Sequence, residues 1–101
     1  MNNLVVIVNA NVIRTVTDRL RELEIPGFTL THVEGHGRRT AEDRFLSARD
    51  RVEGFVPRVR VDIVLPDEQV TKVLDALRDG SIGLAGHGIY WVSPVDRLGR
   101  F

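Results

Sequence analysis

Two Gly-His-Gly triplets are the positions in this chain whose residue types are best suited to binding a ligand. The first, Gly35–Gly37, runs directly into Arg38 and Arg39, and the second is Gly86–Gly88. Glycine-rich turns expose backbone N–H groups, and a guanidinium group forms strong charge-assisted hydrogen bonds with oxyanions. The two triplets therefore indicate a site for phosphate or another small anion.

The remaining polar residues do not indicate catalysis or a metal site. The chain has no cysteine, which excludes disulfides, thiolate metal ligands and a cysteine nucleophile. His36 and His87 fall in separate loops, so we expect no metal and interpret both as loop residues or as hydrogen-bond donors to a ligand. Because no Ser-His-Asp set, carboxylate pair or Walker-type motif is evident, we expect no catalytic residues and no enzymatic activity.

Composition and length set the broad class of protein. Lysine plus arginine and aspartate plus glutamate both number 14, and the arginines of residues 34–54 alternate with acids, so we expect no nucleic-acid partner. A chain of 101 residues predicts one domain over residues 1–101, with a small core that association would help to stabilise. Residues 1–10 resemble a strand rather than a signal peptide, and we expect a cytoplasmic protein.

The first half of the chain predicts a strand, a helix and a second strand. Residues 4–8 are a continuous, mostly β-branched apolar run, as in a buried strand. We expect a helix capped by Asn9 or Asn11 and ended by Pro26-Gly27, followed by an alternating strand over residues 28–33. The apolar stripe expected on the helix is Val12, Val16, Leu20 and Leu23.

The second half predicts the same order of elements. Residues 55–65 alternate strictly, which indicates a strand with one face on the core. Asp67 is the expected cap of the second helix, Gly80 its end, and residues 89–92 the last strand. The order β-α-β-β-α-β is typical of the ferredoxin-like α+β sandwich, and the apolar last strand indicates that other subunits cover its exposed surface.

These elements and motifs resemble those of a PII-type signalling protein. Gly35-His36-Gly37-Arg38 is similar to the base of the family's T-loop, and residues 55–60, Phe-Val-Pro-Arg-Val-Arg, to its Phe-x-Pro-Lys-x-Lys strand start. Gly86-His87-Gly88-Ile89 is similar to the Gly-Asp-Gly-Lys signature of its B-loop. The resemblance implies a homotrimer with a long T-loop at about residues 37–54 and a B-loop at about residues 80–88.

The resemblance also implies an adenine nucleotide in the clefts between subunits. The residues that it assigns to nucleotide binding are Thr29, Gly37, Arg38, Arg39, Arg58, Val64, Gly86, His87, Gly88 and Arg100. The arginines that could hold a small anion are Arg38, Arg39, Arg58 and Arg60. The T-loop would present Phe45, Leu46 and Arg49 to a protein target; a membrane transporter is one candidate for that target.

Departures from the family pattern narrow this prediction. Ile89 stands where nitrogen-sensing members have a phosphate-binding lysine, and Arg39 stands where they have a glutamine. Arg51 replaces the modified tyrosine of the T-loop. We therefore expect ADP or AMP rather than ATP with magnesium and 2-oxoglutarate. The chain looks most like PII-like proteins linked to carboxysomes and inorganic-carbon uptake, for which bicarbonate is the expected second ligand.

Three alternatives remain open from the sequence. The first is a nitrogen-regulatory PII-type protein. The second is a trimeric ferredoxin-like protein that binds a divalent metal through His36 or His87 and takes no nucleotide. The third is a small enzyme acting on an anionic substrate, for which His87 or Glu34 would be the acid or base.

Overall fold

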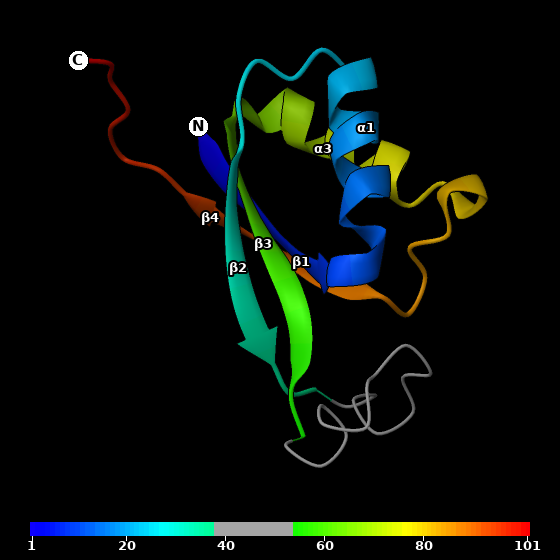
Figure 1. The fold of residues 1–101 in the computed structure, drawn as a ribbon. Helices are drawn as coiled ribbons and strands as arrows, with labels where there is room; N and C mark the ends of the chain where they lie inside the picture. The colour runs from blue at the N-terminus through cyan, green and yellow to red at the C-terminus, as the bar shows by residue number, and fades with distance from the viewer. Residues whose placement is uncertain (38–53) are drawn as a thin grey trace.

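Four antiparallel strands form one sheet, and two helices cover one of its faces (Figure 1). The computed structural model describes residues 1–37 and 54–101. The strands are β1 (Asn2–Asn9), β2 (Thr29–Gly35), β3 (Val56–Leu65) and β4 (Gly88–Pro94), in the order β2-β3-β1-β4. The helices are α1 (Ile13–Glu22) and α3 (Asp67–Leu77), with short 3₁₀ turns η1 (Ala10–Val12) and η3 (Gly80–Ile82). The predicted order of elements is confirmed.

The core lies between the sheet and the two helices. Leu4, Val6 and Val8 of β1 lie opposite Ile63, Val61 and Val59 of β3, and opposed residues on antiparallel strands point to the same face. The buried cluster is Leu4, Val6, Val8, Val16, Leu20, Val61, Ile63, Leu65, Val70, Val73 and Leu77. The alternation predicted for residues 55–65 therefore places the apolar side chains as expected.

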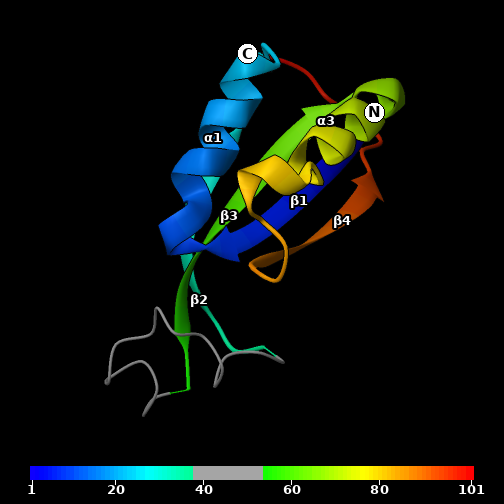
Figure 2. The same ribbon diagram turned by 90° about the vertical axis from the view of Figure 1, so that its right-hand side faces the viewer.

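No helix among the described residues covers the other face of the sheet, called here the open face (Figure 2). The register assigns to this face Asn3, Val5, Ile7, Asn9, Thr29, Thr31, Val33, Arg58, Arg60, Asp62, Val64, Ile89, Trp91 and Ser93. Near its centre the Arg60 Nε lies 2.8 Å from an Asp62 carboxylate oxygen, and the guanidinium lies 5.5 Å from the Trp91 ring centre. The open face thus combines apolar side chains with a paired arginine.

The first helix ends earlier than predicted. It stops at Glu22, four residues before Pro26, and Leu23 is 37% exposed instead of lying in the apolar stripe. Glu24 adopts a left-handed φ of 57°. Its N–H donates to the Arg21 carbonyl at 2.9 Å, while the Ile25 N–H donates to the Leu20 carbonyl at 3.1 Å. This is a Schellman motif built without glycine, so no residue type at this position indicates it.

Both predictions of side-chain helix caps were wrong. Turn η1 precedes α1; Asn9 makes no side-chain cap hydrogen bond, and Asn11 lies inside η1, so that Val12 occupies the cap position of α1. Pro66 precedes α3, so Asp67 lies in the first turn, where its negative charge interacts favourably with the helix dipole. The Asp67 carboxylate also accepts a hydrogen bond from the Asn2 side-chain amide. In the described ranges, no helix has the length and apolar character needed to cross a membrane.

Candidate functional site

The two Gly-His-Gly triplets lie at the same end of the sheet, beside its two edge strands, β2 and β4. Although about fifty residues separate them in the sequence, β2 ends at Gly35 and β4 begins at Gly88 on the same side of the molecule. Asn9, the last residue of β1, pairs with Arg58 of β3. The pairing of the strands therefore gathers Asn9, Gly35–Gly37, Arg58 and Gly86–Gly88 into what is called here the triplet end of the sheet.

Arg58 lies directly over the backbone of the first triplet. A Cβ atom added at Gly35 would be 2.6 Å from both Cδ and Nε of Arg58, and one added at Gly37 would be 3.4 Å from its Nη2. Glycine at position 35 is thus required by the close approach of this side chain. Within the described part of the chain, Arg58 Nε is buried and has no hydrogen-bond partner, which is costly for a donor on a charged group.

His36 closes the base of the segment between β2 and β3. Its Nδ1 lies 2.5 Å from the Gly54 carbonyl oxygen, and because that oxygen can only accept, Nδ1 carries the hydrogen. The ring also meets Phe55 edge-on, with 6.3 Å between ring centres. His36 is therefore a loop residue that joins the two ends of the segment, one of the two roles expected from the sequence.

The second triplet is attached to the end of β1. The Asn9 N–H donates to the His87 carbonyl at 3.0 Å, and the Asn9 side-chain nitrogen lies 3.4 Å from His87 Nδ1. A Cβ atom at Gly88 would lie 2.6 Å from the Ile7 carbonyl oxygen. Asn9 contacts the second triplet instead of capping a helix. In the sequence, this contact is indicated only by the position of Asn9 at the end of a strand.

Three residues assigned to nucleotide binding lie at the opposite end of the sheet. Thr29 begins β2 and pairs with Asp62, while Val64 pairs with Asn3 near the start of β1. Six strand residues separate Arg58 from Val64, a distance of roughly 20 Å at 3.3 Å per residue. Arg100 belongs to the C-terminal tail, which leaves the sheet at this same opposite end (Figure 1). A single chain therefore does not bring the assigned residues together.

The rest of the predicted anion and partner residues are Arg60 and five residues outside the described ranges. Arg60 is the anion candidate whose guanidinium is already paired with Asp62. The remaining candidates, namely Arg38, Arg39, Phe45, Leu46 and Arg49, lie outside the described residues. Within residues 1–37 and 54–101, no three histidine, aspartate or glutamate side chains are grouped closely enough to hold a metal ion.

Comparisons with known proteins agree with the fold. A family model described as "Protein of unknown function (DUF3240)" matches residues 2–101. The Nitrogen regulatory protein P-II of Rhizobium meliloti is 33% identical over 86 residues, which cover 84% of this chain and 77% of that protein. The chain belongs to the DUF3240 family and is a homologue of the PII proteins. The predicted resemblance is thereby confirmed at the level of the family.

Further relatives support this placement. The Nitrogen regulatory protein P-II 1 of Escherichia coli is also 33% identical to this DUF3240 protein over 86 residues, with the same coverage of 84% and 77%. The crystal structure of a DUF3240 family protein from Shewanella baltica superposes with a TM-score of 0.74 at 25% identity, covering 99% of this chain and 94% of that one. Homology to PII regulatory proteins supports a regulatory role for this DUF3240 protein.

Proposed function

We propose that this protein is a PII-like sensor that binds an adenine nucleotide, ADP or AMP, together with a small anion. Bicarbonate is the anion that we favour. The ligands occupy clefts between the subunits of a homotrimer, and their binding changes the conformation of the T-loop, through which the protein regulates a target in inorganic-carbon metabolism.

The arrangement of Arg58 is the single observation that carries the proposal. Its buried Nε has no partner in the described part of the chain, and its side chain lies against Gly35 and Gly37. An unpaired buried donor on a charged group is costly, so an anion at this point offsets a free-energy cost that the ligand-free protein carries. The second triplet lies at the same end of the sheet.

The division of the assigned residues supports a site shared between two subunits. Gly37, Arg58 and Gly86–Gly88 belong to the triplet end, whereas Thr29, Val64 and Arg100 belong to the opposite end. One nucleotide can contact both sets only if the opposite end of one subunit lies beside the triplet end of the next. The proposed nucleotide site therefore needs association, which the exposed apolar strand β4 also favours, since Ile89 is 60% exposed.

Titration calorimetry with ADP, carried out with and without bicarbonate, tests the proposal. Wild-type protein should bind ADP, and bicarbonate and ADP should each raise the other's affinity by the same factor. Arg58→Gln removes the charge and should weaken ADP binding about tenfold or more, since charge-assisted hydrogen bonds contribute about 1.5–3 kcal/mol.

The matched control is Arg14→Gln, which removes an exposed guanidinium from α1 and should leave ADP affinity unchanged. Absence of ADP binding to the wild-type protein would refute the nucleotide proposal. If ADP binds with the same affinity whether or not bicarbonate is present, the proposal of bicarbonate as a second ligand is refuted, while the proposal of nucleotide binding stands.

A nitrogen-regulatory role is the second candidate, and the names of the relatives favour it. It predicts that ATP with magnesium and 2-oxoglutarate binds more tightly than ADP with bicarbonate. The same calorimetric series therefore separates the two functions. Ile89 supplies no charge where a phosphate-binding lysine is expected, which is our reason for placing this candidate second.

A further inference from the structure

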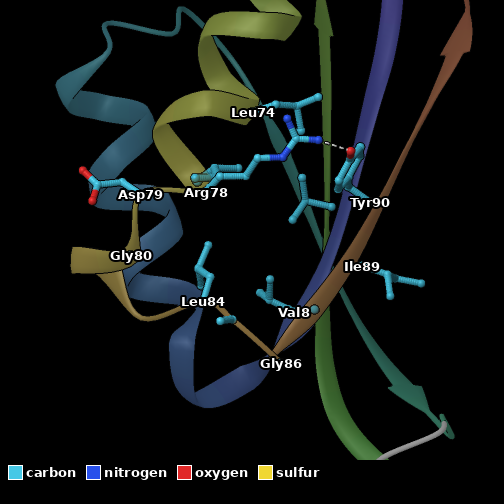
Figure 3. Close-up of a pocket in the computed structure, with 13 residues that line it drawn as sticks. Val8, Leu74, Arg78, Asp79, Gly80, Leu84, Gly86, Ile89 and Tyr90 are labelled. Atoms are coloured by element: carbon cyan, nitrogen blue, oxygen red, sulfur yellow. Dashed lines mark hydrogen bonds between the residues drawn. The ribbon is translucent and has the colours of Figure 1, made fainter.

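A pocket of about 280 Å³ lies on the helix side of the sheet, between the end of α3 and strand β4 (Figure 3). Helix α3 contributes Leu74 and Leu77 to its lining, and Arg78 follows directly after the helix. Apart from Gly86 and Gly88, its residues lie outside the set assigned to nucleotide binding. The pocket and Arg58 therefore lie on opposite faces of the sheet.

The interior of the pocket is apolar. Val6, Val8 and Leu77 are each less than a tenth exposed and form its deepest part. Leu74 and Leu84, which pack against the core, complete the walls. A volume near the lower limit for ligand sites, together with aliphatic walls, suits a ring or a branched chain of a few carbon atoms.

Two hydrogen-bond donors lie together at the edge of this apolar interior. The Arg78 Nη2 donates to the Tyr90 hydroxyl oxygen (Figure 3), and the guanidinium lies 5.2 Å from the centre of the Tyr90 ring. Because the tyrosine oxygen accepts this hydrogen bond, its own hydrogen remains able to donate. The polar edge therefore offers donors, and it complements a ligand group that accepts.

The neighbouring acids leave the Arg78 guanidinium accessible. Asp79 is directed away from Arg78 (Figure 3) and is held by Arg19 Nη2 at 3.2 Å and by the Ser81 N–H at 2.9 Å. Asp75 lies 4.0 Å from Arg78 Nη1, and the two side chains are 71% and 57% exposed. Such an exposed pair contributes little, so a carboxylate from a ligand can replace it.

We propose that this pocket binds a small carboxylate with an aromatic or branched apolar body. The body lies against Val6, Val8 and Leu84, and the carboxylate accepts hydrogen bonds from Arg78 and Tyr90. Because Gly86 and Gly88 line the pocket, the bound molecule also contacts the loop that carries the second triplet. The proposal rests on the pocket alone and does not depend on nucleotide binding.

Nuclear magnetic resonance titration of the full chain with three probes tests this inference. Phenylacetate has both the apolar body and the charge, phenylacetamide has the body alone, and acetate has the charge alone. Phenylacetate should bind with a dissociation constant of about 0.1–10 mM and at least about tenfold more tightly than either of the other probes. The amide signals that shift should be those of the lining residues.

Arg78→Gln should reduce the affinity for phenylacetate to that of phenylacetamide. The matched control is Arg21→Gln, because Arg21 is also exposed and pairs with an aspartate three residues away, but it lies on α1 outside the pocket. Leu84→Phe, which fills the pocket, should abolish binding while the amide spectrum shows a folded chain. Equal affinities for phenylacetate and phenylacetamide, or shifts confined to the open face, would overturn the proposal.

Discussion

Glu24 has a backbone conformation that its residue type does not favour. Its left-handed φ of 57° brings Cβ close to the following carbonyl, a strain that glycine avoids. The two hydrogen bonds of the Schellman motif, from Glu24 and Ile25 to the last turn of α1, hold it there. The end of the helix is therefore set by these backbone hydrogen bonds rather than by the type of residue at the cap.

Glu24→Gly should raise the free energy of unfolding by about 0.5–1 kcal/mol, because the left-handed strain disappears and exceeds the entropy that glycine adds to the unfolded chain. Urea denaturation at neutral pH measures the change. Glu24→Ala is the control, since it removes the charge but keeps the Cβ atom, and its stability should stay near that of the wild type. Equal gains in the two variants would show that charge, and not backbone strain, is responsible.

Helix α1 and turn η3 are joined by one carboxylate. The Asp79 side chain accepts a hydrogen bond from the Ser81 N–H at 2.9 Å and pairs with Arg19 of α1 at 3.2 Å. The Ser81 backbone N–H is the main cause that lowers the pKa of Asp79 below its ordinary 3.8, followed by the Ser81 side chain, with a further contribution from Arg19. The charged form of Asp79 therefore favours the folded state.

This lowered pKa predicts the direction of one pH effect. A depressed folded-state pKa contributes stability above the unfolded pKa and loses it as the pH falls through the folded value. Asp79→Asn keeps an acceptor for Ser81 but removes the charge, so its free energy of unfolding should fall less than that of the wild type between about pH 5 and pH 3. Urea denaturation at a series of pH values measures the difference.

Asp79→Ala serves as the comparison, because it removes the acceptor as well and should be less stable than Asp79→Asn at neutral pH. Parallel pH profiles for the wild type and Asp79→Asn would contradict a role for this carboxylate in acid sensitivity.

Strand prediction succeeded where the pattern was local and strict. The alternation over residues 55–65 predicted β3, which spans Val56–Leu65, to within one residue. Helix ends were predicted poorly. The left-handed residue after α1 is Glu24 rather than the usual glycine, and Asn9 contacts His87 instead of capping α1. The sequence predicted that the two triplets and Arg58 belong to the site. It could not predict the contact made by Asn9, because the partner residue, His87, lies 78 positions away.

The whole molecule presents an apolar edge that a single chain leaves exposed. Strand β4 lies at the edge of the sheet, and Ile89, Tyr90, Trp91 and Val92 are all at least 40% exposed. Such an edge favours pairing with another chain. Trp91 lies on the open face, stacked against Arg60, where the proposed homotrimer would bury it.

Sedimentation equilibrium should give the wild-type protein a mass three times that of the 11.4 kDa chain. Trp91→Lys places a second positive charge beside Arg60 and should shift the equilibrium toward monomers, because an unpaired charge is costly to bury. Gln69→Lys adds the same charge at an exposed position of α3 and should leave the trimer intact. A monomeric wild-type protein would contradict the proposed assembly.

The sequence by itself determined the elements and the core, because periodicity along a strand or helix depends only on neighbouring residues. It also excluded thiol chemistry, since the chain has no cysteine. The tertiary structure alone decided which residues meet: Arg58 over Gly35, Asn9 beside His87, and Arg78 at the edge of an apolar pocket. These contacts follow from strand register and from the packing of α3 against β1 and β4, which no local pattern specifies.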